Sequence, residues 1–254
     1  MRRAVQTLLG LAALLAVCLP LRAETVVAGL SRDAINITAN FVGSEILIFG
    51  AVERDAPSPE GDLEVIITIE GPSEPVAVRR KDRRFGIWVN AASIEVDEAP
   101  SFYAVATTGT MADALSQVED LRHHVSISRA IRAVGTGVEH PEEFTNALIR
   151  IRESEDLYQS IEGGVTLRNE TLFDTSIRLP ANLVEGDYRT RIFLTRGGEV
   201  LDVYEQDIAV RKVGIERFIY NLAHERPLVY GILSLAIAIA AGWLASAVFR
   251  YIRA

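Results

Sequence analysis

The sequence predicts a mainly β fold with immunoglobulin-like β-sandwich regions, a helical section between them and one C-terminal transmembrane helix. Three observations predict this class. Short β-branched segments separated by turn residues fill two blocks of the chain. The section between the blocks is rich in helix-forming residues and long charged side chains. An uncharged apolar run near the C-terminus is long enough to cross a bilayer.

Residues 1–23 have the pattern of a secretory signal peptide. Two arginines near the start precede an apolar run at residues 8–19, and the small residue Ala23 stands before the polar Glu24. We therefore expect cleavage after Ala23 and export of the chain that follows.

An alternative is a lipoprotein signal that ends at Cys18, which is less favoured because Val17 is bulky where a small residue is typical. With cleavage after Ala23 the mature chain has no cysteine, so its stability does not depend on disulfides.

Residues 24–108 are predicted to form a β-sandwich domain, because about seven short strands at near-regular spacing are typical of one. Turn residues at 55–61, 71–72 and 99–100 separate the strands. The Cys…Trp…Cys signature of immunoglobulin domains is missing, and we interpret Trp88 as core or edge packing. The expected strands span residues 25–30, 35–39, 45–53, 63–70, 75–80, 85–90 and 102–107.

Residues 109–162 are predicted to form a helical section, with helices over 112–124 and 141–158. Pro141, followed by two glutamates, is a typical helix start, because proline suits the first turn and acids suit the positive end of the helix dipole.

Residues 163–212 are predicted to form a second β region, with a hairpin turn at 196–199. Four strands make a thin sheet, so we expect this region to lean on the helices or on the first domain. Whether the two β regions share one core is left open. The expected strands span residues 164–168, 172–179, 187–195 and 200–210.

Residues 213–226 are predicted to form an amphipathic juxtamembrane helix. Ile215, Phe218, Ile219 and Leu222 recur at the spacing i, i+3, i+4, i+7. This helix either packs on the exported domain or lies among the lipid headgroups.

Residues 227–249 are predicted to form a transmembrane helix, followed by a cytoplasmic tail at 250–254. The 22 residues from 228 to 249 carry no charge, and at about 1.5 Å per residue they cross a hydrocarbon core of ~30 Å. Arg250 and Arg253 follow the span, and positive charge is typical of the cytoplasmic side. Together with the signal peptide, this pattern predicts a single-pass protein with an exported N-terminal domain.

Small residues within the span form a ridge of the small-xxx-small type, at Ala238, Gly242 and Ser246. Such ridges allow helices to approach closely, so we take this one as a candidate for packing against a membrane-protein partner or a second copy of the chain.

The sharpest local anomaly is a run of five cations in six residues, made of Arg79, Arg80, Lys81, Arg83 and Arg84. Its place between two expected strands predicts a hairpin tip. The run is either a solvated loop that protects a sheet edge or a candidate interaction site for anionic lipid headgroups or an acidic partner surface.

The phrases Ala147-Leu148-Ile149-Arg150, Leu179-Pro180-Ala181-Asn182 and Gly186-Asp187-Tyr188, with Gly231 opening the apolar span, are familiar as a set. With the signal peptide and the C-terminal span, the chain resembles an uncharacterised alphaproteobacterial transmembrane protein family. The resemblance implies a Gram-negative source, with the domain in the periplasm and the anchor in the inner membrane. It implies no reaction and no binding residues. An association of the family with sulfite-exporter-type permeases implies a transport-accessory role.

The composition and motifs argue against several classes of protein. With 26 basic and 34 acidic residues the net charge is −8, whereas a general nucleic-acid binder is basic. The single cysteine excludes a disulfide scaffold, a cysteine-ligated zinc site and an iron–sulfur cluster. No G-x-S-x-G, S-x-x-K, H-E-x-x-H or Walker motif occurs, so we expect no enzyme, no catalytic residue and no cofactor.

A metal site is the weaker alternative. His123, His124 and His140, with nearby acids such as Glu142, are the residue types that bind copper or zinc. Adjacent histidines on a helix point about 100° apart, however, and do not chelate one ion together. We therefore predict no metal ligand.

These observations predict a single-pass inner-membrane protein with a periplasmic β-rich domain, which acts as a non-enzymatic accessory or interaction module, with a position beside a permease as a further guess. Its expected partners are the lipid bilayer and a membrane protein or a second copy bound through the span, and not nucleic acid. The alternative is a membrane-tethered periplasmic protein that binds a ligand or a metal.

Overall fold

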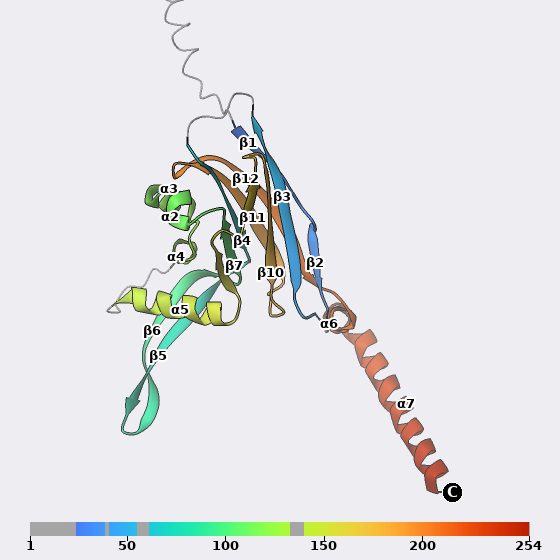
Figure 1. Cartoon of the computed structure of the whole chain (residues 1–254). Coiled ribbons are helices and arrows are strands. Elements are labelled where there is room, and N and C mark those ends of the chain that lie inside the picture. Colours follow the sequence, from blue (N-terminus) through green and yellow to red (C-terminus); the bar gives the residue numbers. More distant parts are fainter. Residues whose placement is uncertain (1–23, 39–40, 55–60, 133–139, 254) are drawn as a thin grey trace, which may run out of the picture.

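The computed structural model describes residues 24–38, 41–54, 61–132 and 140–253 (Figure 1). The predicted signal peptide, including Cys18, and most of the predicted turn at 55–61 lie outside these residues. The predicted mainly β class, with several sheets and an apolar C-terminal helix, is confirmed. The immunoglobulin-like detail stays a prediction.

The first sheet has the strand order β1-β3-β10-β9, and all its pairs are antiparallel. Its strands alternate between inward and outward side chains, as expected for a sheet with one face on the core. In β10, for example, Phe173, Ile177 and Leu179 are buried on one face. The strands are β1 (Glu24–Leu30), β3 (Ser44–Arg54), β9 (Thr166–Arg168) and β10 (Leu172–Leu179).

The second sheet has the order β2-β12-β11-β4-β7-β8, with parallel pairs at its two edges. Its central strands β4 and β7 are buried on both faces, because α2 and α4 cover the face turned away from the core (Figure 1). The strands are β2 (Ala34–Ile37), β4 (Leu63–Glu70), β7 (Tyr103–Thr107), β8 (Tyr158–Ile161), β11 (Gly186–Arg196) and β12 (Glu199–Lys212).

The two β regions share one core, which answers the question that the sequence leaves open. Strand β3 of the first region pairs with β10 of the second, and β4 pairs with β11. Apolar side chains of both regions belong to a single buried cluster that includes Ile46, Ile67, Phe173 and Phe193.

The helical section is more broken than predicted. The helix expected over 112–124 is divided, because Leu115 is extended and the Ser116 hydroxyl accepts a hydrogen bond from the Glu119 backbone N–H, which starts a new helix. The helix expected over 141–158 begins at Pro141 as predicted but ends at Ser154. The helices are α2 (Met111–Ala114), α3 (Gln117–His123), α4 (Ile127–Ala130) and α5 (Pro141–Ser154).

Tyr158 explains the early end of α5. Its side chain is buried, its hydroxyl donates a hydrogen bond of 2.8 Å to the Pro100 carbonyl, and its backbone pairs with Tyr103 in strand β8. Tyr158, which the sequence pattern assigns to the helix, therefore belongs to strand β8 instead.

A third, two-stranded sheet is a long hairpin made of β5 (Ser73–Arg84) and β6 (Ile87–Pro100). The prediction that the cationic run forms the hairpin tip is wrong. The run lies in β5, and the tip is the two-residue turn at Phe85 and Gly86, whose positive φ angles of 52° and 85° give the turn that twisted hairpins prefer.

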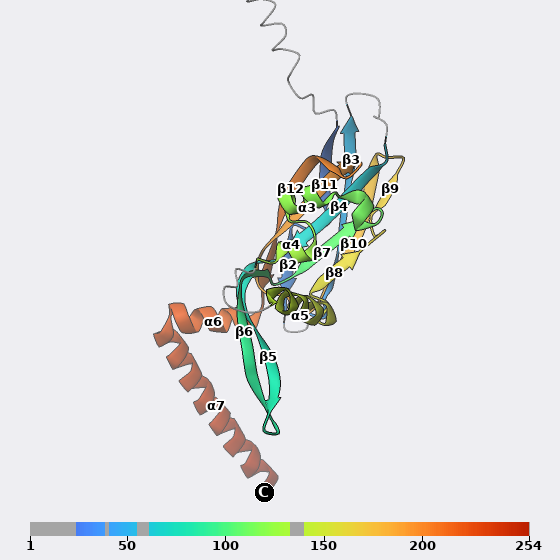
Figure 2. The same ribbon diagram turned by 90° about the vertical axis from the view of Figure 1, so that its left-hand side faces the viewer.

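The C-terminal segment consists of α6 (Ile215–Glu225) and α7 (Pro227–Arg253). Helix α7 starts at Pro227, as expected, and continues through the predicted tail to Arg253. Its apolar stretch Pro227–Ser246 is long enough to cross a membrane, and none of it is buried within the chain. Figures 1 and 2 show α7 leaving the domain at the end where α6 lies.

A buried ionic cluster joins the two sheets. Glu24 of β1 is 5% exposed and accepts a hydrogen bond of 2.7 Å from Arg54 of β3. Arg196 of β11, in the other sheet, reaches both carboxylate oxygens of Glu24 at 2.9 Å. Removing the carboxylate leaves two guanidinium groups in a poorly hydrated place without their shared counter-charge.

We therefore expect Glu24→Gln to lower the free energy of unfolding by about 3 kcal/mol, the scale for breaking a buried ion pair. Urea unfolding of the full chain in detergent, followed by far-ultraviolet circular dichroism, measures the change. Glu53→Gln, at an exposed position of β3, is the matched control and should change the value by less than about 0.5 kcal/mol. Equal effects of the two substitutions would contradict this role.

Buried tyrosines predict a loss of stability at alkaline pH. Burial raises the pKa of Tyr158 and of Tyr188 to about 12, whereas an unfolded tyrosine titrates near 10. The folded chain therefore keeps protons that the unfolded chain releases as the pH rises from about 10 to 12. The free energy of unfolding should be unaffected by these groups below pH ~10 and fall above it.

Urea unfolding at a series of pH values tests this expectation. The double variant Tyr158→Phe/Tyr188→Phe should be less stable at neutral pH, because its hydroxyl hydrogen bonds are lost, but should show a shallower alkaline decline. An equally steep decline in the variant would assign the effect to other groups.

Candidate functional site

The distal half of the β5–β6 hairpin, residues 79–93, is the most unusual surface of the described chain, and we call it the arm. At the base of the hairpin, Ile94 and Val96 of β6 are buried. Within the arm no residue is buried, and most are exposed on both faces of the ribbon. The arm therefore extends beyond the hydrophobic core, as Figure 2 shows. A two-stranded ribbon without a core has little stability of its own.

All five cations of the predicted interaction site lie on the β5 strand of the arm. Side chains alternate along a strand, so Arg79, Lys81 and Arg83 share one face and Arg80 and Arg84 share the other. These cations are only partly neutralised.

Two of them have acidic partners. Arg80 lies 3.3 Å from Glu143 of α5, with its guanidinium above the Phe144 ring, and Arg84 lies 3.8 Å from Asp82. The other three cations of the run make no ion pair within the described residues.

Apolar side chains cap the arm. Phe85 is fully exposed, and Ile87 and Trp88 are 65% and 69% exposed. The interpretation of Trp88 as core or edge packing is therefore not supported, because its strand has left the core at this point. The exposed tip could have been found from the sequence, because Phe85 followed by Gly86 is a pattern that fits a two-residue turn. The prediction of a strand over residues 85–90 missed this turn.

The helix-packing ridge lies apart from the arm, in the apolar stretch of α7. Ala238, Gly242 and Ser246 are exposed, and a methyl group added at Gly242 would meet no atom of the chain within 4 Å. At about 100° per residue the three positions lie on one face of the helix. The ridge is open to a partner.

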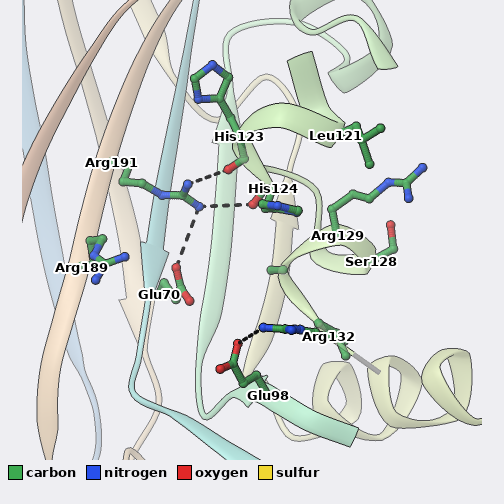
Figure 3. A pocket seen from close by; sticks show the side chains of 12 residues that line it. Glu70, Glu98, Leu121, His123, His124, Ser128, Arg129, Arg132, Arg189 and Arg191 are labelled. Carbon is green, nitrogen blue, oxygen red and sulfur yellow. Dashed lines mark hydrogen bonds and ion pairs between the residues drawn. The ribbon is translucent and has the colours of Figure 1, made fainter. Parts of the chain in front are cut away.

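A pocket that the sequence does not predict lies between the outer face of the second sheet and α3–α4 (Figure 3). Its volume is about 520 Å³, and cations dominate its wall. Arg129 and Arg189 make no ion pair within the described residues, while Arg132 lies 4.0 Å from Glu98. The arginines come from two distant parts of the chain, so no local motif announces the pocket.

Arg191 holds the pocket together. Its guanidinium donates hydrogen bonds to the His123 and His124 carbonyls at 2.7 and 3.2 Å and lies 3.9 Å from Glu70 (Figure 3). These carbonyls lie at the C-terminal end of α3, where His124 has a left-handed conformation. Beside them, burial raises the pKa of Tyr103, whose hydroxyl donates to the Val125 carbonyl at 2.6 Å.

Two of the three histidines considered for a metal have separate acidic partners. The His123 ring lies 3.3 Å from Glu119, and the His140 ring lies 3.2 Å from Glu142. Hydrogen bonding holds the pKa of Glu142 below its ordinary value, with its own backbone N–H as the main cause and His140 as a lesser one. The part of the chain that the structure describes contains no group of three or more histidine, cysteine or acidic side chains able to hold a metal ion.

Comparison with known proteins identifies a family. The model of the family described as "Putative transmembrane protein (Alph_Pro_TM)" matches residues 25–251. No curated protein matches the chain.

Two solved structures are similar at a low level. Spo0M, a sporulation control protein from Bacillus subtilis, is 13% identical with a TM-score of 0.27, over 79% of this chain and 56% of Spo0M. BslA, described as a bacterial hydrophobin, is 11% identical with a TM-score of 0.21, over 75% of this chain and 97% of BslA. The chain thus spans little more than half the length of Spo0M. Likenesses at these TM-scores indicate neither a shared fold nor a shared function.

Proposed function

The chain belongs to the Alph_Pro_TM family of transmembrane proteins, and from this premise we propose that it is a single-pass inner-membrane accessory protein. Its β domain lies in the periplasm and acts through protein contacts, without catalysing a reaction. The observation that carries the proposal is α7. This helix exposes its whole apolar stretch, and within the described chain it packs mainly against α6.

The orientation rests on charge. Arg250 and Arg253 lie at the end of α7, after an uncharged span, and cations are retained on the cytoplasmic side during insertion. The predicted signal peptide exports the opposite end. Both features favour a periplasmic domain.

The ridge on α7 supports a partner within the membrane. Helices associate in lipid through close packing at small residues, since lipid tails are as apolar as leucine and provide no hydrophobic drive. Gly242 at the centre of the ridge leaves space for another helix. We propose that this helix belongs to a membrane protein, with a sulfite-exporter-type permease as the candidate suggested by the family resemblance.

The pocket favours a second candidate function, binding of a small anionic ligand. Arg129 and Arg189, which make no ion pair within the described ranges, attract negative charge. The accessory function does not need this pocket, so titration with inorganic phosphate, which the pocket would bind, separates the two candidates.

The double substitution Gly242→Leu/Ser246→Leu should abolish co-purification of a membrane partner, because leucine side chains prevent close approach at the ridge. Gentle-detergent purification of the tagged protein at native level, followed by mass spectrometry, measures partner recovery. Ala236→Leu/Ala240→Leu places two leucines on a different face of α7 and is the matched control, with recovery expected as in the unmodified chain.

Unchanged recovery with the ridge variant would remove the ridge from the interface. Recovery of the chain alone, in both variants and in the unmodified protein, would contradict the accessory function and favour ligand binding.

A further inference from the structure

We infer that the arm dips its tip into the outer leaflet of the membrane that holds α7, where the arm cations bind anionic phospholipid headgroups. The protein then contacts the bilayer at two separate points. The inference rests on the proposed function for one element only, the insertion of α7. It assigns the cationic run and the exposed tip to one partner, the lipid surface.

The strand registers place the arm and the anchor at the same end of the domain. Glu70, where β4 ends and the chain turns toward the arm, pairs with Arg189 of β11. Gly186, three residues away on β11, pairs with Val210, close to the end of β12 and the start of α6. The sheet thus releases the arm and the helices from one edge, and Figures 1 and 2 both show them extending to the same side.

The arm is long enough to reach the bilayer surface. Strand β5 has 12 residues, and the six from Arg79 to the turn extend ~20 Å at about 3.3 Å per residue. This length lies beyond the last buried residues of the hairpin base. Helix α6 separates α7 from the sheet, and the anchor and the arm both extend below the domain, on opposite sides of it in Figure 1.

The order of side chains along the arm matches the layers of a leaflet. Phe85 and Ile87 lie at the extreme tip with Trp88 next to them, and aromatic rings favour the boundary between headgroups and acyl chains. Arg83 and Arg84 follow within one or two residues, and Arg79 is farthest from the tip. Lysine and arginine at this height contact lipid phosphates, and their long stems let the charge stay in the headgroup layer.

A role of the cations in protecting the sheet edge does not explain the exposed apolar side chains at the tip. Charges on an exposed strand prevent pairing between sheet edges, but that purpose is not served by three exposed apolar side chains at the turn. Since the chain carries an excess of acid overall, an anionic surface repels most of the domain and attracts the arm. Charge and hydrophobicity therefore favour the same contact.

Intrinsic fluorescence tests the inference in the full chain. The sequence has two tryptophans, Trp88 and Trp243, so Trp243→Phe leaves Trp88 as the sole reporter. The variant is reconstituted into vesicles of phosphatidylethanolamine and phosphatidylglycerol, and flotation first establishes that the chain is in the membrane. We expect Trp88 to emit at a shorter wavelength than a tryptophan exposed to water. Its fluorescence should be quenched by brominated lipid and protected from quenching by acrylamide.

Matched charge variants test the role of the cations. In the Trp243→Phe background, Lys81→Gln/Arg83→Gln/Arg84→Gln should weaken quenching by brominated lipid and remove its dependence on phosphatidylglycerol. Arg122→Gln/Arg168→Gln/Arg178→Gln removes the same charge from exposed positions outside the arm and outside the pocket and should leave quenching unchanged.

Each of the other outcomes contradicts either the inference about the arm or the proposed function. A chain that floats but leaves Trp88 open to acrylamide and untouched by brominated lipid overturns the inference and leaves the proposed function intact. Protection from acrylamide without lipid quenching assigns the arm to a protein surface instead. A chain that does not float contradicts the anchor, on which the inference and the proposed function both rest.

Discussion

The apolar surface of α7 is the constraint on which the arrangement of the whole molecule depends. Its stretch Pro227–Ser246 presents apolar side chains on every face, and the described domain covers none of them. A helix satisfies its own backbone hydrogen bonds and can therefore span lipid, whereas in water this surface would be costly. Once α7 lies in the bilayer, the end of the domain that carries α6 faces the membrane, and the elements released at that end, above all the arm, become membrane-proximal.

The domain is fastened at the opposite end. Glu24 joins Arg54 of one sheet to Arg196 of the other, and the register pairs Arg196 with Leu63, at the far end of β4 from Glu70. The interleaved pairing of β3 with β10 and of β4 with β11 makes the sheets one unit. The sheets thus fix the points from which the arm and α6 leave the domain, while the ionic cluster lies at the opposite end.

Local sequence patterns predict the strands and the anchor well, because β-branched alternation and an uncharged apolar run act within a few residues. They do not predict pairings between distant strands, so the shared core could not be derived. Tyr158 has helical neighbours, yet its burial and its hydrogen bond to Pro100 depend on chain 58 residues away. The sequence predicts only part of the arm. The run of cations is evident from the sequence, but the exposure of Phe85 and Trp88 depends on where the hairpin leaves the core. The pocket could not be predicted, because Arg129 of α4 and Arg189 of β11 are brought together only by the folding of the chain.

The most direct test of this arrangement compares the depth of the two ends of the domain in the membrane. A nitroxide label is attached at Ile87→Cys or at Glu199→Cys in a Cys18→Ser full chain, and its collisions with oxygen and with a water-soluble nickel chelate are measured in vesicles. Strand β12 has 14 residues, so Glu199 lies ~45 Å from the membrane-proximal end at about 3.3 Å per residue. The account predicts that oxygen dominates at position 87 and nickel at position 199. Equal nickel accessibility at both positions would contradict it.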